Sequence, residues 1–218
     1  MLAKVYGSAV FGVEATTITV EVNVDTGIGY HLVGLPDSAV KESSYRIAAA
    51  LKNVGRKFPG KKITVNMAPA DLRKEGSAYD LTFAMGILIA SGQIEAEDIK
   101  DYIIMGELSL DGSLQPIKGA LPIAIKAKQE GFKGFFLPKQ NVKEAAVVSG
   151  LDVYGIESIE EIISFFDEGA ELEKTIIDTR HEFYQELEHP EHDFSDVKGQ
   201  ESIKRCMEIA AAGGHNII

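Results

Sequence analysis

One stretch of the chain carries residue types that bind phosphate in other proteins. Residues 55–62 read GRKFPGKK, one residue short of the pattern G-x-x-x-x-G-K-[ST]. A phosphate-binding loop lies between a strand and a helix, so that backbone N–H groups and the helix N-terminus face the phosphates. Here the glycines follow a predicted helix, and Lys62 stands where Ser or Thr would hold magnesium. We therefore interpret the stretch as a helix cap followed by a basic turn.

A serine and a lysine raise a second chemistry, that of a Ser-Lys hydrolase. In such a site a desolvated lysine activates a serine for nucleophilic attack. Ser77 is equally suited to cap a helix that begins at Ala78, and Lys118 to be a surface charge beside Gly119. From the residues alone we favour the cap and the surface charge.

Three carboxylates near this serine form a possible acidic cluster. Asp71, Glu75 and Asp80 have a spacing that fits capping and ion pairs with Arg73 and Lys74 as well as it fits catalysis. Asp80 falls inside a stretch that reads as a buried helix. We therefore expect it to form a salt bridge with a basic residue.

Other side chains argue against metal, disulfide and membrane chemistry. No Cys/His cluster has metal-ligand spacing, and Cys206 is the only cysteine, so an intrachain disulfide is excluded. No apolar run reaches the roughly 18 residues of a spanning helix, and the N-terminus reads as a strand rather than a signal peptide. We expect no membrane association, no metal ligands and a cytoplasmic, reducing compartment.

The net charge of -11 hides a basic region. Residues 41–74 carry nine basic side chains against Glu42 and Asp71, whereas residues 157–193 carry thirteen acidic side chains against Lys174 and Arg180. A basic face can meet nucleic acid, remain solvated, or receive the acidic segment of the same chain. The candidate nucleic-acid residues are Arg46, Arg56, Lys57, Lys61, Lys62 and Lys74.

The periodicity of the chain predicts one mixed α/β domain over residues 1–167. Residues 16–27 alternate as a half-buried strand, residues 27–36 form another, and Asp37 or Ser38 can cap a helix that runs to Val54, with Gly55 beyond its end. A strand follows at 61–69 and a buried helix at 77–90. Further along, Asp111-Gly112 signals a hairpin, and helices and strands then alternate, which favours parallel pairing.

Beyond residue 167 the composition changes twice. Residues 168–193 are acidic and read as a linker with at most a turn of helix. Residues 194–218 return to globular patterning, with a helix from Gln200 to Ala212 and a strand beginning at HNII. A strand that stops after two or three residues is unusual, so we expect the sequence to be a fragment of a longer protein.

Longer stretches are more specific than any of these signals. GLPDSAVKESSYRIAAALKNVG, KKITVNMAPADLRKEGSAYDLTFAMGILIASG and GELSLDGSLQPIKGALPIAIKAKQEGF resemble the N-terminal domain of the ComM/YifB family, which are magnesium-chelatase-like AAA+ ATPases. DFSDVKGQESIKRCMEIAAAGGHNII resembles the start of that family's ATPase domain, truncated before its Walker A loop. The resemblance covers essentially the whole chain and implies that GRKFPGKK is not the P-loop.

That N-terminal domain is similar to the Lon protease domain and to the second domain of ribosomal protein S5. The resemblance implies a mixed sheet with helices on one side. Lon-type peptidases carry D-G-P-S-A-G, with the nucleophilic serine, and a lysine shortly after P-I-G-G. Aligned without a gap, Ala78 takes the place of the nucleophile and Leu121 that of the lysine. We therefore expect an inactive, repurposed domain.

The family implies ATP-driven work on DNA by a hexameric ring, in branch migration and recombination during DNA uptake. ATP would meet Val197, Gly199 and Gln200, whereas Mg²⁺ and the γ-phosphate would need residues outside these 218. We expect a non-proteolytic accessory domain with no ATP hydrolysis of its own. Two alternatives stay open: a Lon-like Ser-Lys peptidase, and a motor subunit that inserts magnesium into a porphyrin.

Overall fold

The computed structural model describes residues 2–178 and 193–217. The chain divides into two compact units, Met1–Ile177 and Asp178–Ile218. Within the described residues, no helix is long and apolar enough to cross a membrane.

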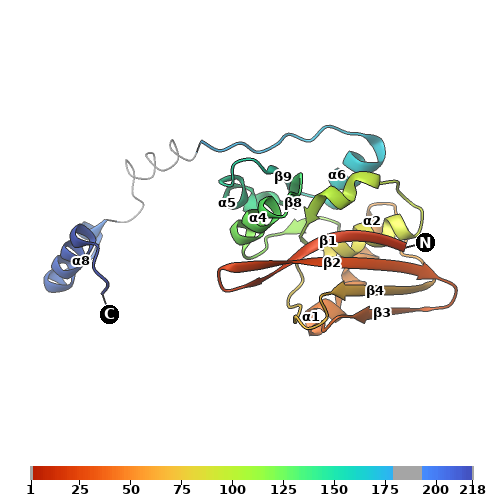
Figure 1. Cartoon of the computed structure of the whole chain (residues 1–218), viewed down its shortest axis with the longest axis horizontal. Helices are drawn as coiled ribbons and strands as arrows, with labels where there is room; N and C mark the ends of the chain where they lie inside the picture. Colours follow the sequence, from red (N-terminus) through yellow and green to blue (C-terminus); the bar gives the residue numbers. More distant parts are fainter. Residues whose placement is uncertain (1, 179–192, 218) are drawn as a thin grey trace. The chain divides into compact units, whose positions relative to one another are not determined.

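The first unit is built on a seven-stranded mixed sheet, which confirms the predicted α/β class. Its spatial order is β3-β4-β2-β1-β5-β8-β9. The pairs β1–β2 and β2–β4 are antiparallel, whereas the other four are parallel (Figure 1). The strands are β1 (Leu2–Phe11), β2 (Glu14–Asp25), β3 (Gly29–Val33), β4 (Lys62–Ala68), β5 (Tyr102–Ile104), β8 (Gly134–Pro138) and β9 (Asp152–Ile156). A separate hairpin joins β6 (Glu107–Leu108) to β7 (Leu114–Gln115) through the predicted Asp111-Gly112 turn.

Short helices connect and cover these strands. The α-helices are α1 (Ser38–Lys41), α2 (Ser43–Asn53), α3 (Asp80–Ala90), α4 (Ala120–Gln129), α5 (Val142–Ala146) and α6 (Ile159–Ile163). The 3₁₀ turns η1 (Glu97–Asp101) and η2 (Lys139–Asn141) and the π-helical turn η3 (Ser164–Glu168) complete the first unit.

Helix α3 is the centre of the core. All of its residues are buried, and it packs on β1 and β2. The helix can lie this close because Gly86 faces the sheet: a Cβ atom there would lie 2.6 Å from Val22 Cγ2. This packing fixes the N-terminal end of α3, and with it the position of Ser77.

The helix boundaries differ from the predicted ones at two places. The helix expected from residue 37 to 54 is two helices, and Asp37 caps the first by accepting the Val40 N–H at 2.8 Å. The helix expected from Ser77 begins only at Asp80, after a turn in which the Asp80 N–H donates to the Ser77 carbonyl at 3.1 Å. Gly55 follows the end of α2 with φ of +72°, as the C-terminal glycine signal predicts.

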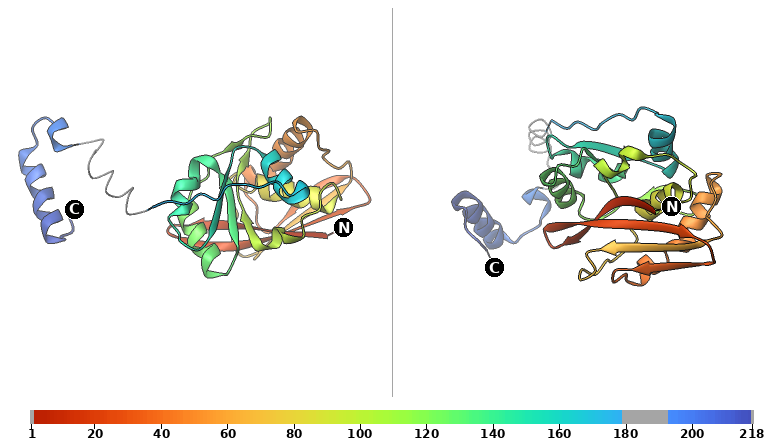
Figure 2. Two further views of the ribbon diagram at one scale, coloured as in Figure 1. Left: turned by 90° about the horizontal axis from the view of Figure 1, so that it is seen from above. Right: turned by 45° about the vertical axis from the view of Figure 1, so that its right-hand side comes forward.

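The first unit extends ten residues beyond the expected boundary at 167. Lys174 pairs with Asp152 at 2.7 Å, and the Thr175 N–H donates to the Val153 carbonyl of β9 at 2.9 Å. Figures 1 and 2 show this segment as an extended trace that leaves η3. Residues 168–177 therefore belong to the folded unit, and residues 179–192 of the predicted linker lie outside the described residues.

The described part of the second unit is a 3₁₀ turn, η4 (Phe194–Asp196), and the helix α8 (Glu201–Gly213). Gly214 ends the helix with φ of +64°. Ile203, Met207 and Ile209 on α8 are about half exposed. The strand expected at HNII is not formed over residues 215–217, and Ile218 lies outside the described residues.

Candidate functional site

A pocket of about 380 Å³ brings Ser77 and Lys118 together. We call it the Ser77 pocket. Its walls are the end of β1 (residues 8–11), the loop before α3 (residues 73–79), and the segment 116–118 that leads to α4; Met105, Glu107 and Ile123 complete it. The fold thus places side by side the two residues that suggested hydrolase chemistry, although 41 residues separate them in the sequence.

Ser77 does not cap α3, contrary to our prediction. The N-cap position belongs to Tyr79 and has no side-chain hydrogen bond. The Ser77 hydroxyl instead donates to the Glu107 carboxylate of β6. Sequence reasoning missed Glu107, because its only local signal is a carboxylate beside a two-residue strand. Lys118 is exposed and forms no ion pair with any other described residue.

A buried ion pair connects the elements that form this pocket. Asp80, 1% exposed, accepts from Arg46 Nε at 2.6 Å and Nη2 at 3.0 Å, which confirms the salt bridge expected for it. Its Oδ2 also accepts the Leu108 N–H of the hairpin at 3.3 Å. Burial raises the pKa of Asp80 to about 6, against the opposing effect of Arg46. The pair joins α2, α3 and the strand that carries Glu107.

Arg46 and Lys74 are therefore part of the interior, although both were candidates for nucleic-acid contact. Arg46 also donates to the Ala39 carbonyl at 2.9 Å. Lys74 is fully buried, and its ammonium donates to the carbonyl oxygens of Pro69 and Leu72, the latter at 2.7 Å. Burial lowers the pKa of Lys74. Lys74 is thus enclosed by the protein, whereas Arg46 keeps 21% of its side chain exposed while two of its donor nitrogens bind Asp80.

Three of the remaining candidates lie on one loop between α2 and β4, residues 55–61, which we call the basic loop, and the fourth, Lys62, follows it as the first residue of β4. The Gln93 side chain anchors the loop by two hydrogen bonds: its Oε1 accepts the Lys57 N–H at 2.9 Å, and its Nε2 donates to the Lys57 carbonyl at 2.8 Å. Arg56 donates to the Gln93 carbonyl at 3.1 Å and pairs with Asp167 at 3.5 Å. Arg56 thus anchors the loop, and Gln93 is a positioning residue that no local sequence pattern indicates.

Four lysines in and beside the basic loop are exposed: Lys52, Lys57, Lys61 and Lys62. None of them forms an ion pair with a described residue. Their charge is therefore available to an anionic partner, and a short backbone-anchored loop presents it at low entropic cost.

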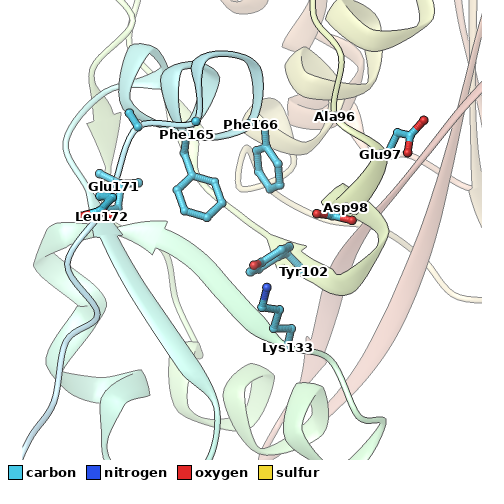
Figure 3. Close-up of a pocket in the computed structure, with 11 residues that line it drawn as sticks. Ala96, Glu97, Asp98, Tyr102, Lys133, Phe165, Phe166, Glu171 and Leu172 are labelled. Atoms are coloured by element: carbon cyan, nitrogen blue, oxygen red, sulfur yellow. The ribbon is translucent and has the colours of Figure 1, made fainter.

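A second pocket, of about 510 Å³, lies between η1 and the segment after η3 (Figure 3). Phe165 and Phe166 point into it beside Tyr102, and Lys133 lies 5.6 Å from the centre of the Tyr102 ring. Hydrogen bonding to Tyr102 raises the pKa of Lys133. Asp98 of η1 lies toward these rings, whereas the Glu97 carboxylate points away from them (Figure 3). Nowhere in the described parts of the chain do three metal-ligating side chains gather.

The residues expected to meet ATP lie within four positions, 197–200, of the turn that leads into α8. Val197, Gly199 and Gln200 are exposed, and Gly199 and Gln200 have φ of +71° and +61°. A left-handed conformation is unusual for glutamine. The turn therefore exposes the Val197 side chain together with two residues in left-handed backbone conformations.

Comparison with known families decides the relationship. The sequence model described as "Subunit ChlI of Mg-chelatase" matches residues 20–141, and the one described as "Magnesium chelatase, subunit ChlI" matches residues 193–218. The chain belongs to the magnesium-chelatase ChlI family. The second match covers the segment that resembles the start of an ATPase domain.

Curated relatives of this ChlI-family chain cover it from end to end. It is 39% identical over 218 residues to the "Competence protein ComM" of Haemophilus influenzae and 40% identical over 219 residues to the "Uncharacterized protein YifB" of Escherichia coli. The chain spans 43% and 42% of the lengths of these two proteins. The predicted ComM/YifB resemblance is confirmed.

More distant relatives agree with the predicted Lon-like fold. An "Archaeal Lon protease" of Methanocaldococcus jannaschii is 24% identical over 174 residues, which are 73% of this chain and 26% of that protein. "Lon protease 2" of Bacillus subtilis is 26% identical over 127 residues, 58% of this chain and 22% of that protein. These similarities agree with the Lon-like fold predicted for this ChlI-family chain.

Proposed function

We propose that the first unit is a non-proteolytic accessory domain of a ChlI-family AAA+ ATPase that acts on DNA, in branch migration or recombination, and that the basic loop contacts the DNA backbone. The observation that carries the proposal is a set of exposed lysines, without ion-pair partners among the described residues, in and beside a loop anchored by Gln93 and Arg56. The name of the Haemophilus relative, a competence protein, agrees with work on DNA.

The chemistry of the loop suits a phosphate backbone rather than base readout. Lysine ammonium groups neutralise phosphates as point charges, and such contacts supply affinity without sequence preference. The loop itself offers Phe58 as its one aromatic side chain, which packs toward Tyr30. We therefore expect binding that is independent of sequence and steeply dependent on salt.

The ATPase role belongs to the complete protein. When bound, ATP with Mg²⁺ supplies the free energy of a phosphoryl transfer that drives the motor. In this chain Val197, Gly199 and Gln200 would contact the adenine, and we expect the complete protein to assemble as a homo-oligomeric, hexameric ring in the cytoplasm. Nucleotide protection of the turn before α8 in hydrogen exchange, compared with protection of α3, would test this contact.

The DNA contact is tested by charge reversal in the complete protein. We expect the triple variant Lys57→Glu, Lys61→Glu, Lys62→Glu to lose at least tenfold in affinity for a labelled duplex, measured by fluorescence anisotropy at 50 mM salt. Because about one counterion is released for each phosphate neutralised, the slope of log K against log salt should also fall by two to three.

Lys100→Glu is the matched control, because Lys100 is an exposed lysine of η1, outside the basic loop. It should leave both affinity and slope close to those of the unchanged protein. If Lys100→Glu lowers log K by a third as much as the triple variant, in proportion to its smaller change of charge, the effect is one of net charge and the assignment of the basic loop is wrong.

A Ser-Lys peptidase is the rival function, and one observation favours it: Ser77 and Lys118 line one pocket. Its weakness is that the Ser77 hydroxyl donates to a carboxylate rather than to the lysine. We expect no cleavage of casein by the complete protein with ATP and Mg²⁺. Cleavage that is lost in Ser77→Ala would establish the peptidase instead.

A further inference from the structure

The Ser77 pocket exists because β1 and β5 diverge. The two strands share a single register pair, Tyr6 with Ile103. The Met105 N–H then donates to the Phe136 carbonyl of β8 at 3.0 Å, and the Gly106 N–H donates to the Ala78 carbonyl at 2.8 Å. The chain after β5 thus turns away from β1, so residues 8–11 have β2 on one side and the pocket on the other.

This half of β1 has no strand partner on the pocket side among the described residues, and the Met105 side chain covers its start at Ser8. The Ser8 N–H points across the gap to Met105 Sδ at 3.2 Å, and a thioether is a weak acceptor. Backbone N–H and C=O groups of alternate residues point to the same side of a strand, so those of Val10 point to the pocket side as those of Ser8 do. Among the described residues, Val10 has no strand partner on that side. Open edges of this kind are templates for an additional strand.

The side chains around the edge define what an added strand would carry. The floor is apolar, with Val10, Met105, Ile117 and Ile123. Arg73 pairs with Glu75 at 3.1 Å, and Glu107 accepts from Ser77. Lys118 is thus the one cation of the pocket that has no carboxylate partner in the described parts of the chain.

We propose that the Ser77 pocket binds, without cutting, an extended acidic peptide segment of a partner protein. The segment adds to β1 at Ser8 and Val10, places an apolar side chain on the floor, and pairs a carboxylate with Lys118. The backbone supplies affinity and the two side chains supply selectivity, as in other cases of strand addition. The volume of about 380 Å³ lies within the range of ligand pockets, roughly 300–1,000 Å³.

Three labelled ten-residue peptides test the proposal on the full chain by fluorescence anisotropy. The first alternates Val with Asp, the second replaces Asp by Asn, and the third keeps Asp but carries N-methyl groups on alternate backbone nitrogens. We expect the Asp peptide to bind at least tenfold more tightly than either of the others, because the Asn peptide lacks the charge and the N-methylated peptide lacks the donors. Equal binding of the N-methylated peptide would overturn strand addition.

Protein variants locate the site. Lys118→Glu should weaken binding of the Asp peptide at least tenfold and binding of the Asn peptide less than twofold. Lys100→Glu should change neither affinity. Both variants replace exposed lysines, so neither is expected to unfold the chain. An equal loss in both, or no binding of any peptide at millimolar concentration, contradicts the proposal.

Cleavage and DNA contact are separated from peptide binding by two further measurements. Ser77→Ala should bind the Asp peptide within twofold of the unchanged chain, and mass spectrometry should find the peptide intact after incubation with either protein. The basic-loop triple variant should also keep peptide binding. Peptide cleavage that depends on Ser77 would replace this proposal with the peptidase, whereas failure of DNA binding would leave it standing.

Discussion

Five of the basic residues between positions 41 and 74 fall into two groups with opposite environments. Arg46 and Lys74 point into the protein, where one meets a buried carboxylate and the other meets two carbonyl oxygens. Lys57, Lys61 and Lys62 lie at the surface without ion-pair partners among the described residues. All five carry the same formal charge in the sequence.

The difference shows how burial divides structural from functional charge. A buried cation must be matched by acceptors, because removal from water costs several kcal/mol unless it is compensated. An exposed cation has no such requirement, and its charge stays free for a partner. The buried cations should therefore control the stability of the fold, whereas the exposed lysines should control binding to DNA.

The largest effect is expected for Arg46→Leu. This variant leaves Asp80 buried without its partner, and breaking a buried pair from one side costs about 3–5 kcal/mol. Urea denaturation followed by circular dichroism would measure it. Lys57→Leu is the control from the exposed region and should cost less than about 0.5 kcal/mol. Similar losses of unfolding free energy in the two variants would contradict this division into structural and functional charges.

The pH dependence of stability tests the same carboxylate. Burial raises the pKa of Asp80 to about 6 from its ordinary 3.8, so between these values the folded state holds the proton more than the unfolded state does. The contribution of Asp80 to the free energy of unfolding should therefore decrease as the pH rises from 4 to 6, by about 2–3 kcal/mol.

Urea titrations at several pH values would follow this decrease as the stability difference between the unchanged chain and Asp80→Asn. Groups common to both proteins cancel in that difference. A difference that grows with pH over this window would mean that Arg46, rather than burial, dominates the titration of Asp80.

Lys74→Met should have the next largest effect. The methionine keeps the length of the side chain but leaves the carbonyl oxygens of Pro69 and Leu72 without their donor, at about 1–3 kcal/mol. Lys61→Met, in the basic loop, should be nearly neutral in the same urea titration. A neutral Lys74→Met would show that water replaces the ammonium and that this lysine is not a structural cation.

The architecture of the first unit was largely predictable from local signals. Alternation predicted β2, turn residues predicted the hairpin at Asp111-Gly112, and helical spacing predicted α3. These signals arise from contacts between residues that are close in the sequence, so a short segment is enough to predict them. The start of α3 was misplaced because Ser77 is a good capping residue, and its actual partner, Glu107, lies 30 residues away.

The site was less predictable because its decisive contacts are long-range. The salt bridge of Asp80 could be expected from its place in an apolar helix, yet nothing local pointed to Arg46, 34 residues earlier. Nor does charge density along the chain distinguish Lys74 from Lys57, since burial is decided by the packing of the whole sheet. The composition of segment 168–177 predicts a linker, because its contacts with β9 depend on backbone groups and one ion pair rather than on apolar side chains.

The smallest effect, expected for Gln93→Ala, separates the position of the basic loop from its charge. Gln93 makes two hydrogen bonds to the backbone of Lys57, so its loss should cost about 1 kcal/mol of stability and leave the number of lysines unchanged. DNA affinity of the complete protein should fall only a few-fold, because the loop must be ordered on binding. The slope of log K against log salt should stay the same, because the phosphates neutralised are the same. If the slope falls as it does in the lysine triple variant, the loop has lost contacts rather than order, and its fixed conformation is itself required for meeting DNA.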